Sequence, residues 1–151
     1  MNGSKKAVLD LLWNEPYKIG HWVGFKDLTA LHNEWLRSFL YADEDQTLLA
    51  HRGSYKTTDL SLFLAIHTVI APNENVMFFR KTDDDVTEVL VQTQKILRTG
   101  CIQQLVRTLY GTDLQFLKEN NSEIHTNLCT STKGVSQVVG LGIGTSITGK
   151  H

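Results

Sequence analysis

The sequence has little of several features that would assign it to a class at once. It holds only two cysteines and two prolines among 151 residues, and its acidic and basic side chains nearly cancel, to a formal net charge of -1. Cys101 and Cys129 have no metal-ligand spacing, so reduced thiols in a cytosolic compartment are the simplest interpretation. Because there is no basic excess, any contact with DNA must be local or lie in parts outside this chain.

Long apolar runs are lacking as well. The basic start is followed by a stretch, 7–12, that is too short for a signal peptide and is interrupted by Asp10. No run approaches the length of a transmembrane helix, which argues against a membrane protein. Hydrophobic residues make up 41% of the sequence and charged residues 21%. This composition predicts one packed, soluble domain inside a cell.

The stretch from Ala50 to Thr58, AHRGSYKTT, is the strongest candidate for a ligand-binding motif in the sequence. A short β-type run at 46–50 precedes it and an apolar segment of helical period follows it, as in a phosphate-binding P-loop. In such a loop the backbone N–H groups and the helix N-terminus hold phosphate oxygens. Lys56 would reach the β- and γ-phosphates of ATP, and the Thr57 hydroxyl would ligate Mg²⁺.

The match to the pattern G-x-x-x-x-G-K-[ST] is partial. Ala50 stands at the first glycine position and Tyr55 at the second, with Gly53 between them. A bulky tyrosine resists the positive φ that a glycine adopts freely. The residues therefore leave a second interpretation open, a plain strand-to-helix turn in which Gly53 forms the bend and Ser54 or Thr57 is the N-cap.

The order of the predicted elements favours the P-loop. A strand at 46–50, a helix at 57–70 and a strand at 75–80 have the length and order of a right-handed βαβ crossover. Such a unit places the loop at the carboxyl end of a parallel strand, where open α/β sheets bind ligands. We therefore predict an α/β fold with a mostly parallel sheet flanked by helices.

Other elements are predicted on both sides of this unit. Helices are expected over 7–13 and 26–41, the second with Asp27 as its N-cap, and 17–24 should be an irregular lead-in.

After the second strand, Thr82 or Asp83 should cap a helix over 84–98, which we prefer to a Mg²⁺-binding role for Asp83. Six residues of this helix have the spacing of an inward face: Val86, Val89, Leu90, Thr93, Ile96 and Leu97.

A shorter helix over 101–110 and three strands, near 114–117, 123–130 and 138–147, complete the chain. The last strand carries alternating glycines, so one of its faces lacks side chains, and close packing is the preferred reason. These glycines are Gly140, Gly142 and Gly144.

Four segments together resemble the ATPase half of the large terminase subunit of tailed bacteriophages, the DNA-packaging motor. They are HNEWL at 32–36, AHRGSYKTT at 50–58, VMFFRKT at 76–82 and GLGIGTSITG at 140–149. The resemblance covers about residues 20–151. It implies a helical lead-in over 1–45, followed over 46–151 by the N-terminal part of a P-loop ATPase domain of the RecA/ASCE type.

The resemblance also implies roles for single residues. Lys56 and Arg52 would be catalytic, since both reach the phosphates and Arg52 would stabilise transition-state charge in cis. Thr57 would hold Mg²⁺. The whole ATP-binding set would be Arg52, Gly53, Ser54, Tyr55, Lys56, Thr57 and Thr58.

The implied setting is the cytoplasm of a bacterial host, without a membrane. The implied partners are double-stranded DNA, the portal protein and the small terminase subunit, and the parent would form a homo-oligomeric ring. No apolar strand ending in paired acids follows the loop, so we expect an incomplete sheet and an amino-terminal piece of a longer protein. The Walker B acid, the water-positioning glutamate, the coupling motif and the nuclease would lie beyond His151.

Two alternatives remain open at this point. The chain could begin a helicase or another P-loop motor, because these share the same βαβ start. It could also be a non-catalytic α/β binding module in which the turn at 52–58 only caps a helix.

Overall fold

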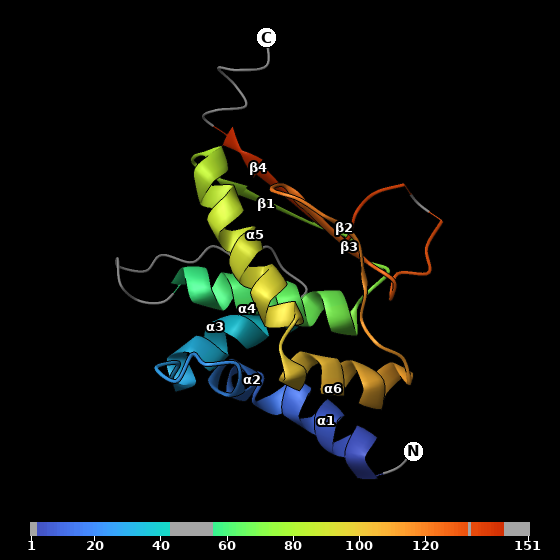
Figure 1. Ribbon diagram of the computed structural model, residues 1–151. Helices are drawn as coiled ribbons and strands as arrows, with labels where there is room; N and C mark the ends of the chain where they lie inside the picture. Colours follow the sequence, from blue (N-terminus) through green and yellow to red (C-terminus); the bar gives the residue numbers. More distant parts are fainter. Residues whose placement is uncertain (1–2, 43–55, 133, 144–151) are drawn as a thin grey trace.

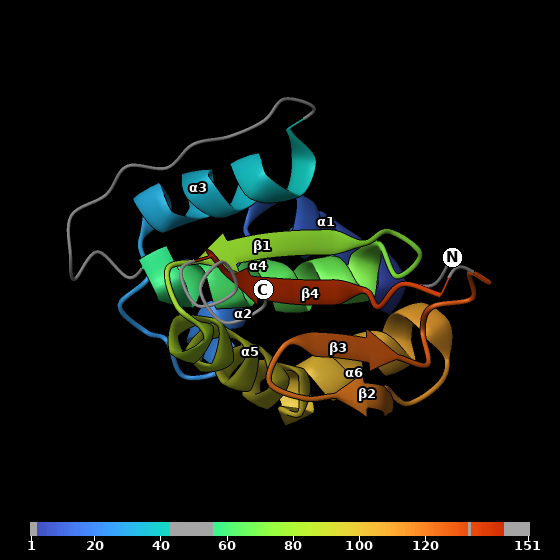
Figure 2. The ribbon, with the colours of Figure 1, turned by 90° about the horizontal axis from the view of Figure 1, so that it is seen from above.

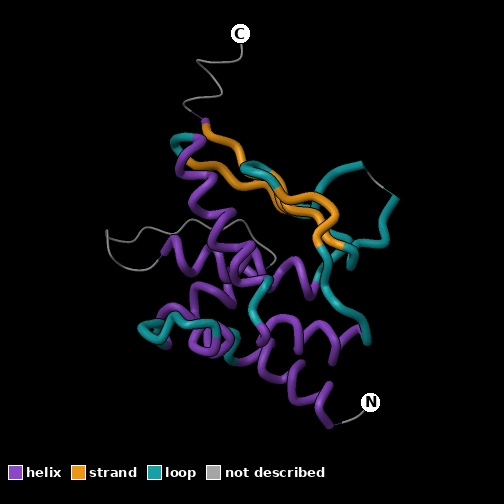
Figure 3. Tube along the Cα trace, in the orientation of Figure 1, coloured by secondary structure: helices purple, strands orange, loops and turns teal. Residues whose placement is uncertain are grey.

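A computed structural model of the protein describes residues 3–42, 56–132 and 134–143 (Figure 1). Among the described residues, the part before residue 76 is helical, and the strands all lie after it (Figure 3). In chain order the elements are α1 (Gly3–Asn14), α2 (Tyr17–Trp22), α3 (Ala30–Tyr41), α4 (Lys56–Ile70), β1 (Val76–Arg80), α5 (Asp83–Leu97), α6 (Gly100–Tyr110), β2 (Phe116–Glu119), β3 (Glu123–Thr126) and β4 (Val138–Gly142).

The described strands form one small mixed sheet in the order β1-β4-β3-β2. Strands β1 and β4 run parallel, with Val76 opposite Val138, while the other two pairs are antiparallel. The α/β class is confirmed, but the prediction of a mostly parallel sheet is wrong for the described strands. One reason is the tight turn between β2 and β3, because strands joined so closely can only pair antiparallel. The described residues between β3 and β4 likewise contain no crossover helix, which a parallel connection usually needs. In the β2–β3 turn Asn120 Oδ1 accepts hydrogen bonds from the backbone N–H groups of Ser122 and Glu123, each at 2.9 Å.

The predicted strand at 46–50 lies outside the described residues, so the βαβ crossover stays a prediction. The two later members of that unit are present. Helix α4 and strand β1 begin and end within one residue of the predicted limits.

The described helices lie on one face of the sheet. Figure 1 shows the sheet nearly edge-on with the helices beneath it, and Figure 2 looks onto the opposite face. Helices α4 and α5 pack against each other, α5 contacts β1 and β4, and α3 packs on α4. Leu36 of α3, Leu62 of α4 and Val89 of α5 are all fully buried in the same apolar core.

Helix α5 follows its sequence prediction closely. Its buried residues are the six that the helical period indicates: Val86, Val89, Leu90, Thr93, Ile96 and Leu97. Thr82 is the N-cap, and its Oγ1 accepts a hydrogen bond from the backbone N–H of Asp85 at 3.1 Å. Three aspartates occupy the first turn, where the positive end of the helix dipole favours them. The interpretation of Asp83 as part of a helix start is confirmed.

The irregular lead-in predicted over 17–24 is instead helix α2. Gly20, which disfavours a helix, sits there for a steric reason. A Cβ at Gly20 would lie 2.5 Å from Leu28 Cδ1 and 2.9 Å from Leu62 Cδ2, so a glycine lets α2 approach these residues without displacing their side chains. The packing of the helix therefore outweighs the weak propensity of one residue.

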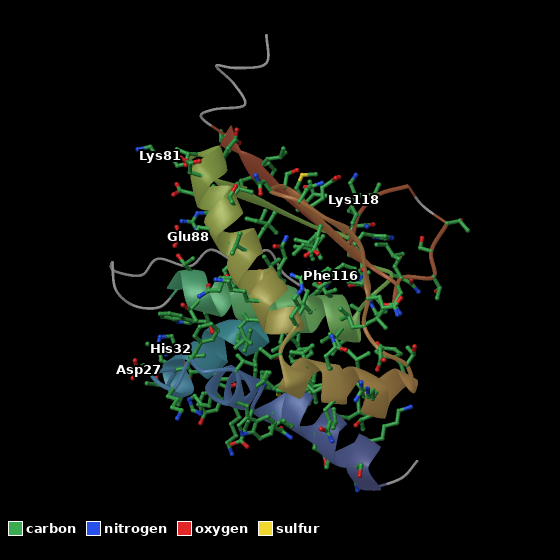
Figure 4. All side chains as sticks on the ribbon, viewed as in Figure 1. Asp27, His32, Lys81, Glu88, Phe116 and Lys118 are labelled. Carbon is green, nitrogen blue, oxygen red and sulfur yellow. The ribbon has the colours of Figure 1, made fainter. Side chains whose placement is uncertain are left out.

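The next helix, α3, starts later than predicted, and its N-cap is Thr29 rather than Asp27. His32 completes a capping box with Thr29, because the backbone N–H of Thr29 donates to His32 Nδ1 at 2.9 Å. Figure 4 labels Asp27 and His32 in this region.

The alternating glycines of β4 are explained by α5, as predicted for Gly140 and Gly142; Gly144 lies outside the described residues. A Cβ on Gly140 would lie 2.6 Å from Val86 Cγ1 and 2.7 Å from Phe78 Cζ. A Cβ on Gly142 would lie 2.5 Å from the backbone nitrogen of Asp83. Backbone atoms cannot move aside as a flexible side chain can, so Gly142 sets the closest approach of α5 to the sheet.

Gly142→Ala should therefore destabilise the protein by about 2–3 kcal/mol, since the first turn of α5 must shift away from β4. Urea unfolding measured by circular dichroism gives this free energy. Gly134→Ala is the matched control, because nothing lies within 4 Å of a Cβ at Gly134. It should change stability by less than about 0.5 kcal/mol, and equal losses in both variants would contradict the packing explanation.

Candidate phosphate site at the amino end of helix α4

The amino end of α4 lies where the parallel strands end. In Figure 2 the start of α4, the arrowheads of β1 and β4 and the start of α5 are at the same end of the molecule. Ligands of α/β proteins bind at this edge, beyond the carboxyl ends of parallel strands. The helix itself begins at Lys56, next to the predicted start at residue 57.

The predicted site residues fall into two groups. Lys56 is the first residue of α4, and Thr57 and Thr58 follow it, half-buried, in the first turn. These three therefore share the helix end that the P-loop interpretation requires. The other four lie outside the described residues: Arg52, Gly53, Ser54 and Tyr55.

Buried hydroxyl groups fix the direction of α4 against α5. Ser61 Oγ donates to the backbone oxygen of Thr57 at 3.1 Å and also reaches the backbone oxygen of Val89 at 3.4 Å. Thr93 Oγ1 donates to Val89 O at 2.8 Å and lies 3.5 Å from Ser61 O. The two helices thus meet through hydroxyl groups as well as apolar side chains, which holds the first turn of α4 in place.

Asp59 is the most unusual residue of this region, and sequence reasoning missed it. Its side chain has no exposed surface, and within the described residues neither carboxyl oxygen has a hydrogen-bond partner. The available signal was an acid on the same helix face as Leu62 and Ile66, both of them fully or almost fully buried.

Burial raises the pKa of the Asp59 carboxyl to about 7. The positive end of the α4 dipole acts in the opposite direction, because it favours the carboxylate, but this effect is worth only about 0.3–2 kcal/mol. Burying an unpaired charge costs several kcal/mol, so burial prevails. At pH values below 7 the acid is therefore mainly protonated, and it then leaves the positive helix end without a neutralising charge.

A Mg²⁺ ion bound with a nucleotide needs few protein ligands, because phosphate oxygens and water supply most of its coordination. Thr57 fits that requirement, since it offers a hard hydroxyl oxygen in the first turn of α4. Among residues 3–42, 56–132 and 134–143, no group of three His, Cys, Asp or Glu side chains could hold a metal alone.

Two hollows flank α5, and neither includes a described residue of α4. One lies beside the β2–β3 turn and is lined by Asp83, Asp84 and Glu123 among others. The other runs between Phe25 and the outer face of α5, where Glu88 also lies. Their carboxylates make both hollows poor sites for phosphate.

Comparison with protein-family models, with curated proteins and with solved structures gave no match to this chain. Function therefore has to be inferred from the residues and their arrangement. In the described part of the chain, no helix combines the length and apolarity needed to cross a membrane.

Asp59→Asn should make the protein more stable at high pH. Asp59 has a higher pKa in the folded protein, about 7, than in the unfolded chain, near 3.8. The folded state therefore holds an extra proton between these values, and the stability of the native protein falls as the pH rises towards 7. Asparagine cannot ionise, so the variant should gain about 4 kcal/mol relative to the native protein between pH 4 and pH 8.

Denaturant unfolding at a series of pH values measures this difference. Asp10→Asn is the control, because Asp10 is exposed on α1 and its replacement should leave the pH profile unchanged. If Asp59→Asn and the native protein had parallel profiles from pH 4 to pH 8, Asp59 would not be buried as an unpaired acid.

Proposed function

We propose that this chain is the ATP-binding portion of a terminase large subunit, the motor that couples ATP hydrolysis to packaging of double-stranded phage DNA. The observation that supports this most is the position of α4. The helix begins at Lys56, immediately after most of the P-loop-like stretch 50–58, and its amino end lies beside the carboxyl ends of parallel β1 and β4. This is the placement that a phosphate-binding loop needs.

In this proposal the backbone N–H groups of 52–58 and the α4 dipole hold the ATP phosphates. The Lys56 ammonium binds the β- and γ-phosphates, and Arg52 stabilises charge that develops on the γ-phosphate. Thr57 Oγ1 ligates Mg²⁺, which would neutralise charge between the phosphates. The protonated form of Asp59 adds no negative charge next to this site.

The described parts of the segments that resemble the terminase family lie in elements that pack on or pair with one another, which supports interpreting these segments together. The segment 76–82 forms β1 and the cap of α5, and the described part of 140–149 lies in β4, the parallel neighbour of β1. The segment 32–36 lies in α3, which packs on α4.

The proposal includes the setting implied by the family. The parent protein would assemble as a homo-oligomeric ring on the portal, act with the small terminase subunit and translocate double-stranded DNA in the bacterial cytoplasm. The fold would then be the N-terminal part of a P-loop NTPase domain of the RecA/ASCE type.

The chain should bind ATP in the presence of Mg²⁺, and Lys56→Ala should weaken the affinity at least tenfold, which is about 1.4 kcal/mol. Isothermal titration calorimetry measures the affinity, and amide chemical shifts of 53–58 locate the contact. Lys95→Ala removes an exposed lysine of α5 and should leave ATP binding unchanged. Absence of binding, with no shift changes at 53–58, would instead favour a binding module with a plain helix cap.

Hydrolysis should be negligible even when ATP binds, because the proposal assigns no residue of this chain as the acid that positions Mg²⁺ or the attacking water. Phosphate release by the purified chain measures turnover. Turnover that persists in Lys56→Ala would point to a contaminating ATPase, and turnover lost in that variant would mean that the chain itself supplies the missing acids.

A further inference from the structure

We draw no further inference here: the strongest candidate, the exposed apolar patch that Met77 and Phe79 of β1 form on the face of the sheet away from the described helices, carries none because nothing in the described part of the chain shows what covers it.

Discussion

The close approach of helix α5 to strand β4 is the constraint on which the rest of the structure depends. It exists because Gly140 and Gly142 have no side chains, so that Val86 and the backbone of Asp83 can lie against the strand. With α5 fixed on the sheet, the Ser61 and Thr93 hydroxyl groups fix α4 on α5. The amino end of α4 is thereby directed to the carboxyl ends of the parallel strands. The position of the candidate site therefore depends on two glycines that are distant from it in the sequence.

Asp59 shows that this arrangement is not optimised for stability alone. A buried acid that has no hydrogen-bond partner among the described residues is a destabilising feature, and an apolar residue of similar size would avoid its cost. Such groups are most often retained where their protonation matters, close to sites that handle charge. The position of Asp59, three residues after Lys56 in the first turn of α4, agrees with that pattern. A neutral acid there keeps the positive helix end available to an anion, whereas an exposed carboxylate would compete with it.

Sequence reasoning succeeded where one local rule governed the outcome and failed where packing or pairing overrode it. The inward face of α5 follows from helical period alone, and Thr82 follows from capping preferences. Helix α2 was missed because its six residues are too few to show a helical period. The mixed sheet was missed because alternation identifies a strand but not its partner or direction. Asp59 required knowledge of burial, and the central part of the loop, 52–55, lies outside the described residues.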